Sequence, residues 1–171
     1  MALDLKHTFD EKTFRHYLNG THIVLHCHHY MSLTTRLAED HDDIGGTRIL
    51  AETAEDSVRP LFDEYVKSHT LAPGDARLKM ATEFYSVMGM GMMEASGTAT
   101  TGKVVLSRSH VDQGWQKKWG NHTKPVNHFT RGYIAAMFGS AFDKPARSYR
   151  VTETESIVMG KPSSTFVVET A

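Results

Sequence analysis

The chain has 171 residues, enough for one domain, and its composition of 40% hydrophobic and 23% charged residues is typical of a folded protein and excludes a disordered one. A formal net charge of −1 leaves no excess of positive charge to neutralise phosphates, so we expect no nucleic-acid partner. No apolar run is long enough to span a membrane, and residues 1–14 lack the apolar core of a signal peptide, so we expect a cytoplasmic protein with no membrane partner.

The first quarter of the chain is polar and rich in histidine. Residues 1–20 are predicted to form a short helix or an arm that ends at the turn dipeptide Asn19-Gly20. The apolar run 23–25 fits either a strand or the buried first turn of a helix. Residues 29–41 carry leucines four positions apart and are predicted to be helical, and the Asp- and Gly-rich segment 42–46 ends that helix.

Two further helices are predicted before residue 88. Apolar residues recur at helical spacing from 47 to 68, and Pro60 inside this pattern is expected to kink or divide the helix. After the turn at 72–74, Asp75 is predicted to be the N-cap of a helix that contains Leu78 and Phe84.

The second half of the chain alternates hairpins with a helix. Apolar runs on either side of the Gly- and Thr-rich turn 97–102 predict a β-hairpin. Residues 126–142 have helical periodicity, and the segments 147–157 and 165–169 predict a second hairpin. This order predicts an α+β domain with helices packed on a mostly antiparallel sheet, and we expect one domain over residues 1–171.

Three segments of the second half carry a family resemblance: Gly89-Met90-Gly91, the stretch 125–133 and the closing stretch 153–166. Together they resemble the 4-vinyl-reductase domain family, most closely over residues 84–169. The resemblance implies a fold with an interior ligand cavity, shared with nitric-oxide-sensing haem domains and vesicle-tethering subunits. It also implies a homodimer that binds aromatic hydrocarbons as a sensor, or a link to bacteriochlorophyll synthesis.

The closing stretch departs from the family pattern at its cysteines. In the aromatic sensors of the family an acidic residue and cysteines hold a structural zinc. Here Glu153 is present, but Ser156 and Ser164 stand at the two following cysteine positions and the upstream one falls near Asn127. Because serine hydroxyls are poor zinc ligands, we expect no structural zinc at these residues.

The main functional hypothesis is a stand-alone domain, sensory or accessory, that binds an apolar, aromatic or tetrapyrrole-like small molecule without catalysis. Methionine, tryptophan and histidine together give an apolar wall with a few hydrogen-bonding points, as ligand sites usually have. Ordinary core packing accounts for the same residue types. The residues predicted to bind the ligand are Met90, Met92, His110, Trp115, Trp119, His128, Tyr133 and Phe138.

A histidine cluster supports a different hypothesis. His26, Cys27, His28 and His29 are adjacent, and imidazole and thiolate are good ligands for a transition metal or haem iron, with His16 or His41 available to complete the shell. On a helix, His22 would share a face with His26 and His29; on a strand, His26 would share one with His28. The alternative function is therefore a metal- or haem-dependent enzyme or gas sensor. A third is a scaffold subunit without a ligand.

Overall fold

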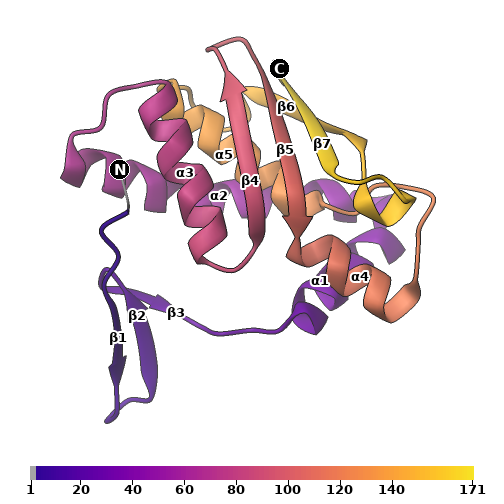
Figure 1. Cartoon of the computed structure of the whole chain (residues 1–171), viewed down its shortest axis with the longest axis horizontal. Coiled ribbons are helices and arrows are strands. Elements are labelled where there is room, and N and C mark those ends of the chain that lie inside the picture. The colour runs from indigo at the N-terminus through magenta and orange to yellow at the C-terminus, as the bar shows by residue number, and fades with distance from the viewer. Residues whose placement is uncertain (1–2) are drawn as a thin grey trace.

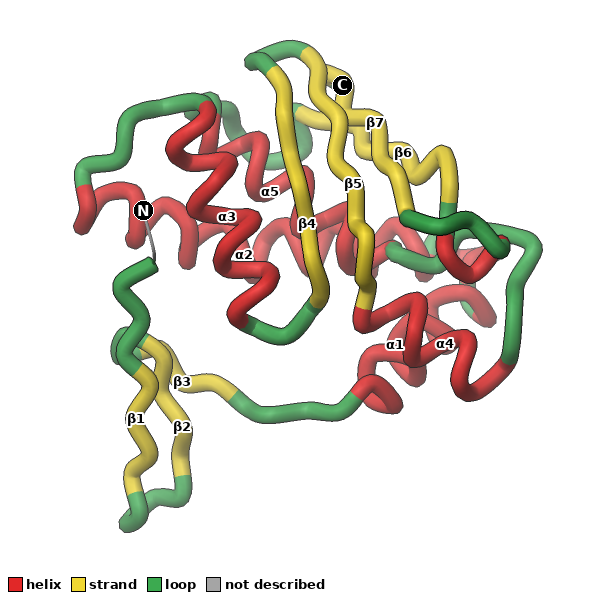
Figure 2. Tube along the Cα trace, in the orientation of Figure 1, coloured by secondary structure: helices red, strands yellow, loops and turns green. Residues whose placement is uncertain are grey.

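A four-stranded antiparallel sheet forms one layer of the protein and helices form the other (Figures 1 and 2). The structure, a computed structural model, describes residues 3–171. The strand order is β4-β5-β7-β6, so each predicted hairpin contributes two neighbouring strands and β5 pairs with β7 in the middle. The strands are β4 (Gly91–Gly97), β5 (Thr101–Ser109), β6 (Tyr149–Glu155) and β7 (Ser164–Thr170).

The α-helices pack behind the sheet and at one of its ends. They are α1 (His28–Asp40), α2 (Gly46–His69), α3 (Asp75–Val87), α4 (His110–Trp119) and α5 (His128–Ala141). Short 3-10 helices, η1 (Asp42–Ile44) and η2 (Ile157–Met159), lie between these elements. Helices α2 and α5 approach closely, because Gly132 has no side chain: a Cβ there would lie 1.9 Å from the carbonyl oxygen of Ala51. Helices α1 and α4 lie together at the end of β5 (Figure 1).

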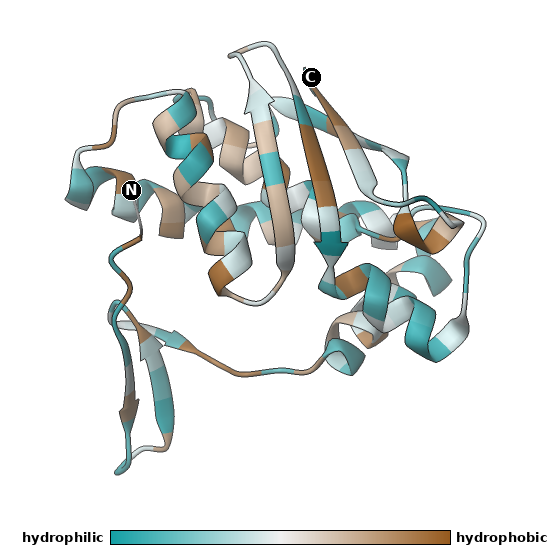
Figure 3. Ribbon diagram, in the orientation of Figure 1, coloured by the Kyte–Doolittle hydropathy of each residue, from teal (hydrophilic) through white to brown (hydrophobic). Residues whose placement is uncertain are grey.

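The core is aromatic and filled by side chains. Helix α5 is its centre: all its residues from Gly132 to Ala141 are buried, between α2, α3 and the sheet. The central strand β5 is largely brown, and so hydrophobic, in Figure 3. The large side chains with no more than 2% exposure include Phe62, Phe84, Tyr85, Leu106, Trp115, Tyr133, Ile134, Phe138 and Phe166.

The N-terminal segment is an arm that projects from the helices and the sheet (Figures 1 and 2). It is a small antiparallel sheet of β1 (His7–Asp10), β2 (Arg15–Leu18) and β3 (Thr21–Ile23). Of the two forms predicted for residues 1–20, the arm is confirmed for the described residues and the helix is wrong. The turn at Asn19-Gly20 is confirmed, with both residues at positive φ. The apolar run 23–25 is a strand only at Ile23, and Val24 is 73% exposed.

The α+β fold and its mostly antiparallel sheet are confirmed, as are both hairpins and the helices predicted at 29–41, 47–68 and 126–142. Of the kink or division expected at Pro60, the division is wrong, since α2 continues through it while packed against α5. The N-cap of α3 is Gly74, and Asp75 is the first helical residue. Helix α4 was not predicted. Within residues 3–171, every helix is too short or too polar to cross a membrane.

Candidate functional site

Six buried polar side chains meet where the sheet joins α4 and α5. We call this group the polar node: Ser109, Asp112, Asn127, Glu153, Ser156 and Ser164. They come from the end of β5, from α4, from the residue before α5, from β6 and its end, and from the start of β7. The node therefore joins segments that are far apart in the sequence, such as Asp112 and Ser164, which are separated by 52 positions.

Asn127 is at the centre of the polar node. Its side-chain amide donates to Asp112 Oδ2 and to Glu153 Oε1, each at 2.8 Å. Its backbone N–H donates to Glu153 Oε2 at 3.2 Å. Its side-chain oxygen accepts from the Ser109 hydroxyl at 3.0 Å. One asparagine thus holds two buried carboxyl groups, which would otherwise be costly to remove from water.

The two serines at the family's cysteine positions also belong to the polar node. Ser164 Oγ donates to Asp112 Oδ2 at 2.9 Å, and Ser156 Oγ donates to Asp112 Oδ1 at 3.2 Å. Ser164 Oγ also accepts from the backbone N–H of Ile157 at 3.0 Å. The serine hydroxyls are neutral and are already hydrogen-bonded to Asp112. Only Asp112 and Glu153 in the polar node carry a side chain that zinc prefers, two short of the four ligands of a structural site, so the residues present do not fit a structural zinc ion.

Burial raises the pKa of Glu153 to about 7, and the nearby charge of Asp112 acts in the same direction, against the hydrogen bonds from Asn127. A carboxyl group that titrates near neutrality inside a folded protein makes the polar node sensitive to pH.

A second chain of polar contacts leads from the end of α1 to α5. His128 Nε2 bonds to Glu39 Oε1, and Arg131 Nη2 donates to His128 Nδ1 at 2.7 Å. Because a guanidinium can only donate, Nδ1 of His128 must accept, and its proton lies on Nε2 and points to Glu39. Burial and then the charge of Arg131 lower the pKa of His128, so this ring is held neutral.

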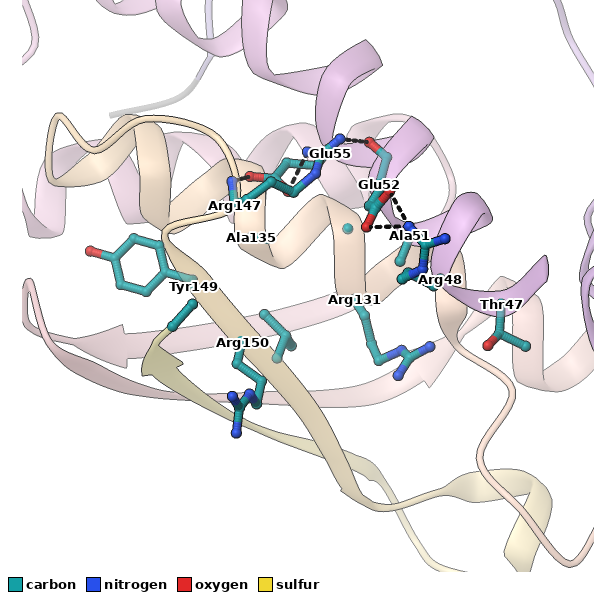
Figure 4. A pocket seen from close by; sticks show the side chains of 13 residues that line it. Thr47, Arg48, Ala51, Glu52, Glu55, Arg131, Ala135, Arg147, Tyr149 and Arg150 are labelled. Carbon is teal, nitrogen blue, oxygen red and sulfur yellow. Dashed lines mark hydrogen bonds and ion pairs between the residues drawn. The ribbon is translucent and has the colours of Figure 1, made fainter. Parts of the chain in front are cut away.

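Beside Arg131 lies an open groove between α2, α5 and β6, with a volume of about 430 Å³ (Figure 4). Its floor consists of Ala51, Gly132 and Ala135, and Tyr149 and Val151 form the wall on β6. Charged side chains surround this apolar floor: Arg48, Glu52, Glu55, Arg131, Arg147 and Arg150. The volume is within the range of small-molecule sites, roughly 300–1,000 Å³.

Most of the arginines and acids at the groove are already paired. Arg48 bonds to Glu52 at 3.0 Å, and Arg147 bonds to Glu55 at 2.7 Å. Arg131 and Arg150 form no ion pair within residues 3–171, and the buried Nε of Arg131 has no hydrogen-bond partner there either. Burial lowers the pKa of Arg131, and the charges of Glu153, Glu39 and Asp42 oppose this effect.

The residues predicted to bind a ligand do not meet at one cavity. Tyr133 and Phe138 are fully buried in the core, and the Tyr133 hydroxyl donates to the Ala81 carbonyl at 2.6 Å. His128 lies in the contact with Glu39. The remainder are Met90, which is buried; Met92, which is exposed on β4; and His110, Trp115 and Trp119, all on α4.

The interior around the predicted ligand-binding residues is densely packed. Two open grooves mark the surface of the described chain, one beside Arg131 and one beside Leu3 and Met93. Trp115, Tyr85 and Phe62 fill the interior with side chains. A ligand in the core would therefore have to displace these side chains, whereas a ligand in a groove would not.

The histidine cluster is spread over a junction between the arm and α4. His26 lies in the linker, Cys27 is the N-cap of α1, and His28 and His29 are its first residues. The ring of His110 lies 5.7 Å from that of His26 and 6.1 Å from that of His28, measured between centroids. His22 is in β3, so the helical face predicted for His22, His26 and His29 is wrong.

The cluster is not assembled as a metal site. In the described part of the chain, no group of three His, Cys, Asp or Glu side chains is arranged to hold a metal ion. His16 bonds to His7 within the arm at 3.0 Å, and His41 lies at the far end of α1, so neither joins the cluster. Cys27 is a free, exposed thiol whose Sγ lies 3.8 Å from His29 Nδ1.

Comparison with solved structures shows what this architecture resembles. The phenol-responsive sensory domain of the transcription activator PoxR, solved with phenol, superposes with a TM-score of 0.74 at 15% identity, over 96% of this chain and 84% of that one. A vinyl-4-reductase family protein from Methanocaldococcus jannaschii superposes with a TM-score of 0.53 at 19% identity, over 71% of this chain and 68% of that one.

This chain has a 4-vinyl-reductase-type fold. A trafficking protein particle complex subunit 3 from Naegleria fowleri, covalently bound to palmitic acid, is similar to this 4-vinyl-reductase-type fold with a TM-score of 0.52 at 12% identity, over 84% of this chain and 95% of that one. No protein-family model matches the sequence, and no curated protein matches it. The resemblance predicted from the closing stretch is thus confirmed at the level of the fold.

Sequence reasoning identified three of the six residues of the polar node as a group and placed Asn127 near them, but it missed Ser109 and Asp112. One signal was available. Ser109 accepts from the backbone N–H of Asp112 at 3.1 Å and caps α4, and a serine followed three positions later by an acidic residue is a helix-start signature. Arg131 was not singled out, because nothing local marks an arginine on a buried helix as unpaired.

Proposed function

We propose that this protein is a sensory domain that binds a small apolar or aromatic molecule. The observation that carries the proposal is the match of nearly the whole chain to a sensory domain that responds to phenol. Fold similarity at this identity does not transfer a ligand, so the ligand class rests on the chemistry of this chain. An apolar-floored groove of ligand size beside an unpaired, half-buried arginine supports it.

Two places are available to such a molecule. One is the aromatic core around Tyr133 and Phe138, which would have to open. The other is the groove between α2, α5 and β6, which is open already. In either place, burial of the ligand's apolar surface supplies about 25 cal/mol per Å².

The test is the thermal unfolding of the whole chain with phenol, toluene, benzoate and palmitate, and with glucose as a polar control. A ligand present at 100 times its dissociation constant stabilises the folded state by about 2.7 kcal/mol, which raises Tm by roughly 5 to 10 °C for a chain of this size. We expect a saturable rise with at least one of the four compounds that have an apolar body and none with glucose. If no compound raises Tm, the protein is not a sensor for this class of molecule.

We also propose that the protein acts as a homodimer in the cytoplasm. The outer face of α1 exposes Tyr30, Leu33 and Leu37, which are spaced for one helix face. Ile44 and Ile49 continue this apolar surface toward the start of α2. An exposed apolar stripe of this kind is typical of an interface. The free thiol of Cys27 is consistent with a reducing compartment.

A further inference from the structure

The groove between α2, α5 and β6 has two chemically different parts. Its floor of Ala51, Gly132 and Ala135 and its wall of Tyr149 and Val151 suit an apolar body. The Tyr149 hydroxyl is already used, donating to the Ala99 carbonyl at 2.9 Å, so only its ring is available to a guest. This part of the groove offers contact area and no strong hydrogen-bonding group.

The polar part of the groove is the Arg131 guanidinium, which extends from α5 into the groove (Figure 4). Nη2 bonds to His128, but the buried Nε has no partner among the described residues. A buried donor of a charged group that lacks a partner is costly and rare in folded proteins. A carboxylate is the group that a guanidinium matches best, through two parallel N–H donors.

No carboxylate within residues 3–171 takes this place. At the groove, Glu52 and Glu55 are held by Arg48 and Arg147. Burial lowers the pKa of Arg131, and the charges of Glu153, Glu39 and Asp42 oppose this effect from a distance. None of these carboxylates forms an ion pair with Arg131. Two arginines at the groove, Arg131 and Arg150, are thus free of ion pairs among the described residues, and Arg150 is exposed on β6. Arg131 is the one whose buried donor lacks a partner there.

We propose that this groove binds a small organic carboxylate, with the carboxylate on Arg131 and the apolar body on the Ala51–Gly132–Ala135 floor. The inference rests on the proposed function and names both its site and the class of its ligand. A monoanion with an aromatic or aliphatic body satisfies both parts of the groove. A neutral phenol would leave Arg131 Nε without an anionic acceptor, and inorganic phosphate would leave the floor uncovered.

The test is calorimetric titration of the whole chain with benzoate, benzyl alcohol, phenol and inorganic phosphate. We expect benzoate to bind at least tenfold more tightly than benzyl alcohol, which has the same ring and no charge, and than phosphate. Arg131→Gln should lower the affinity for benzoate at least tenfold. Arg108→Gln, which removes an exposed arginine on β5, should change it less than twofold.

Two further measurements keep the proposal testable if Arg131→Gln does not fold. Ala51→Leu keeps Arg131 but fills the groove from a half-buried position, and it should also weaken benzoate binding. In the wild type, benzoate should shift the NMR signals of the His128 ring, which bonds to Arg131, and not those of His7 on the arm.

The outcomes separate this inference from the proposed function. If phenol or benzyl alcohol binds as tightly as benzoate, or if folded Arg131→Gln binds benzoate like the wild type, the carboxylate site is wrong while the sensory function stands. If none of the aromatic compounds binds the wild type, the carboxylate site is wrong, and if toluene and palmitate also fail to raise Tm, the sensory function is wrong as well.

Discussion

At the scale of single residues, the polar node concentrates buried charge without a cation bonded to it among the described residues. Asp112 is fully buried, and Glu153 is nearly so, yet their partners within the polar node are the side-chain amide and backbone N–H of Asn127 and two serine hydroxyls. Such an arrangement is stable only if every donor and acceptor is matched, because a half-satisfied network is worse than an apolar core. The node therefore fixes the positions of α4, α5 and β6 at the cost of sensitivity to pH.

The pH dependence of stability has a definite sign. Burial raises the pKa of Glu153 from its ordinary 4.5 to about 7, so the folded state holds this proton more tightly than the unfolded state does. The contribution of Glu153 is most favourable below pH 4.5, falls as the pH rises to about 7, and is then constant. The shift corresponds to about 3 kcal/mol.

Glu153→Gln should remove this dependence. The variant loses one acceptor for Asn127, so it is less stable than the wild type at pH 5, but the difference narrows toward pH 8 because the wild type alone loses stability. Urea denaturation at pH 5, 6, 7 and 8 measures the free energy of unfolding of the wild type and of the variant. Parallel pH profiles for the two proteins would show that Glu153 does not titrate in this range.

His128 gives a second residue-scale prediction. Because Arg131 lowers the pKa of His128, Arg131→Gln should raise it, and Glu39 should then stabilise the protonated ring. A pH titration followed by the NMR imidazole C–H signals measures the change, and the His7 signals should be the same in the variant and the wild type at each pH. An unchanged pKa would mean that burial alone keeps His128 neutral.

At the scale of elements, the contact between α2 and α5 depends on one missing side chain. A Cβ at Gly132 would lie 1.9 Å from Ala51 O and 2.9 Å from Ala54 Cβ, so Gly132→Ala forces the helices apart. We expect a loss of about 3 kcal/mol in the free energy of unfolding, at the upper end for overpacking, measured by urea denaturation.

Gly89→Ala is the matched control for that variant. Gly89 has a positive φ of 77° but no atom within 4 Å of an added Cβ, so only backbone strain of about 1 kcal/mol is expected. An equal loss of the free energy of unfolding in the two variants would show that α2 and α5 can move apart without destabilising the protein.

The elements that were predicted correctly have a strong local pattern. Helix α2 repeats apolar residues along its 24 residues, and each hairpin has two apolar runs about a turn. Helix α4 was missed because Gln113-Gly114 interrupts a mostly polar segment. Helix α4 has a glycine at position 114 because α1 packs against it, and a Cβ at Gly114 would lie 2.6 Å from Ser32 Oγ. That reason lies in another helix and leaves no trace in the local sequence.

The candidate site was harder to predict than the fold for the same reason. The partners of Asn127 are 15, 18, 26 and 37 positions away, and no pattern within one helix or strand brings them together. The histidines, in contrast, were prominent because they are neighbours in the sequence. Side chains of neighbouring residues at the start of a helix point in different directions. The ring of His110, from α4, lies near the rings of both His26 and His28.

At the scale of the whole molecule, the exposed face of α1 predicts self-association. Leu37 is 51% exposed at the centre of the apolar stripe, so Leu37→Glu should raise the dissociation constant of a homodimer at least tenfold. Sedimentation velocity measures this against a wild-type species of twice 19.2 kDa.

Val87→Glu, an equally drastic change at an exposed residue of α3, is the control and should leave the dimer intact. A wild type that sediments at the mass of one chain at high micromolar concentration would contradict the homodimer.

The contacts from Arg131 through His128 to Glu39 connect the groove to the helix that carries the apolar stripe. An anion that draws Arg131 toward the groove weakens its hold on His128, and Glu39 is two residues from Leu37 on α1. Coupling between two binding events acts equally in both directions. The affinity for a carboxylate should then depend on the protein concentration. A dilute and a concentrated protein sample should give different titration curves for the same compound.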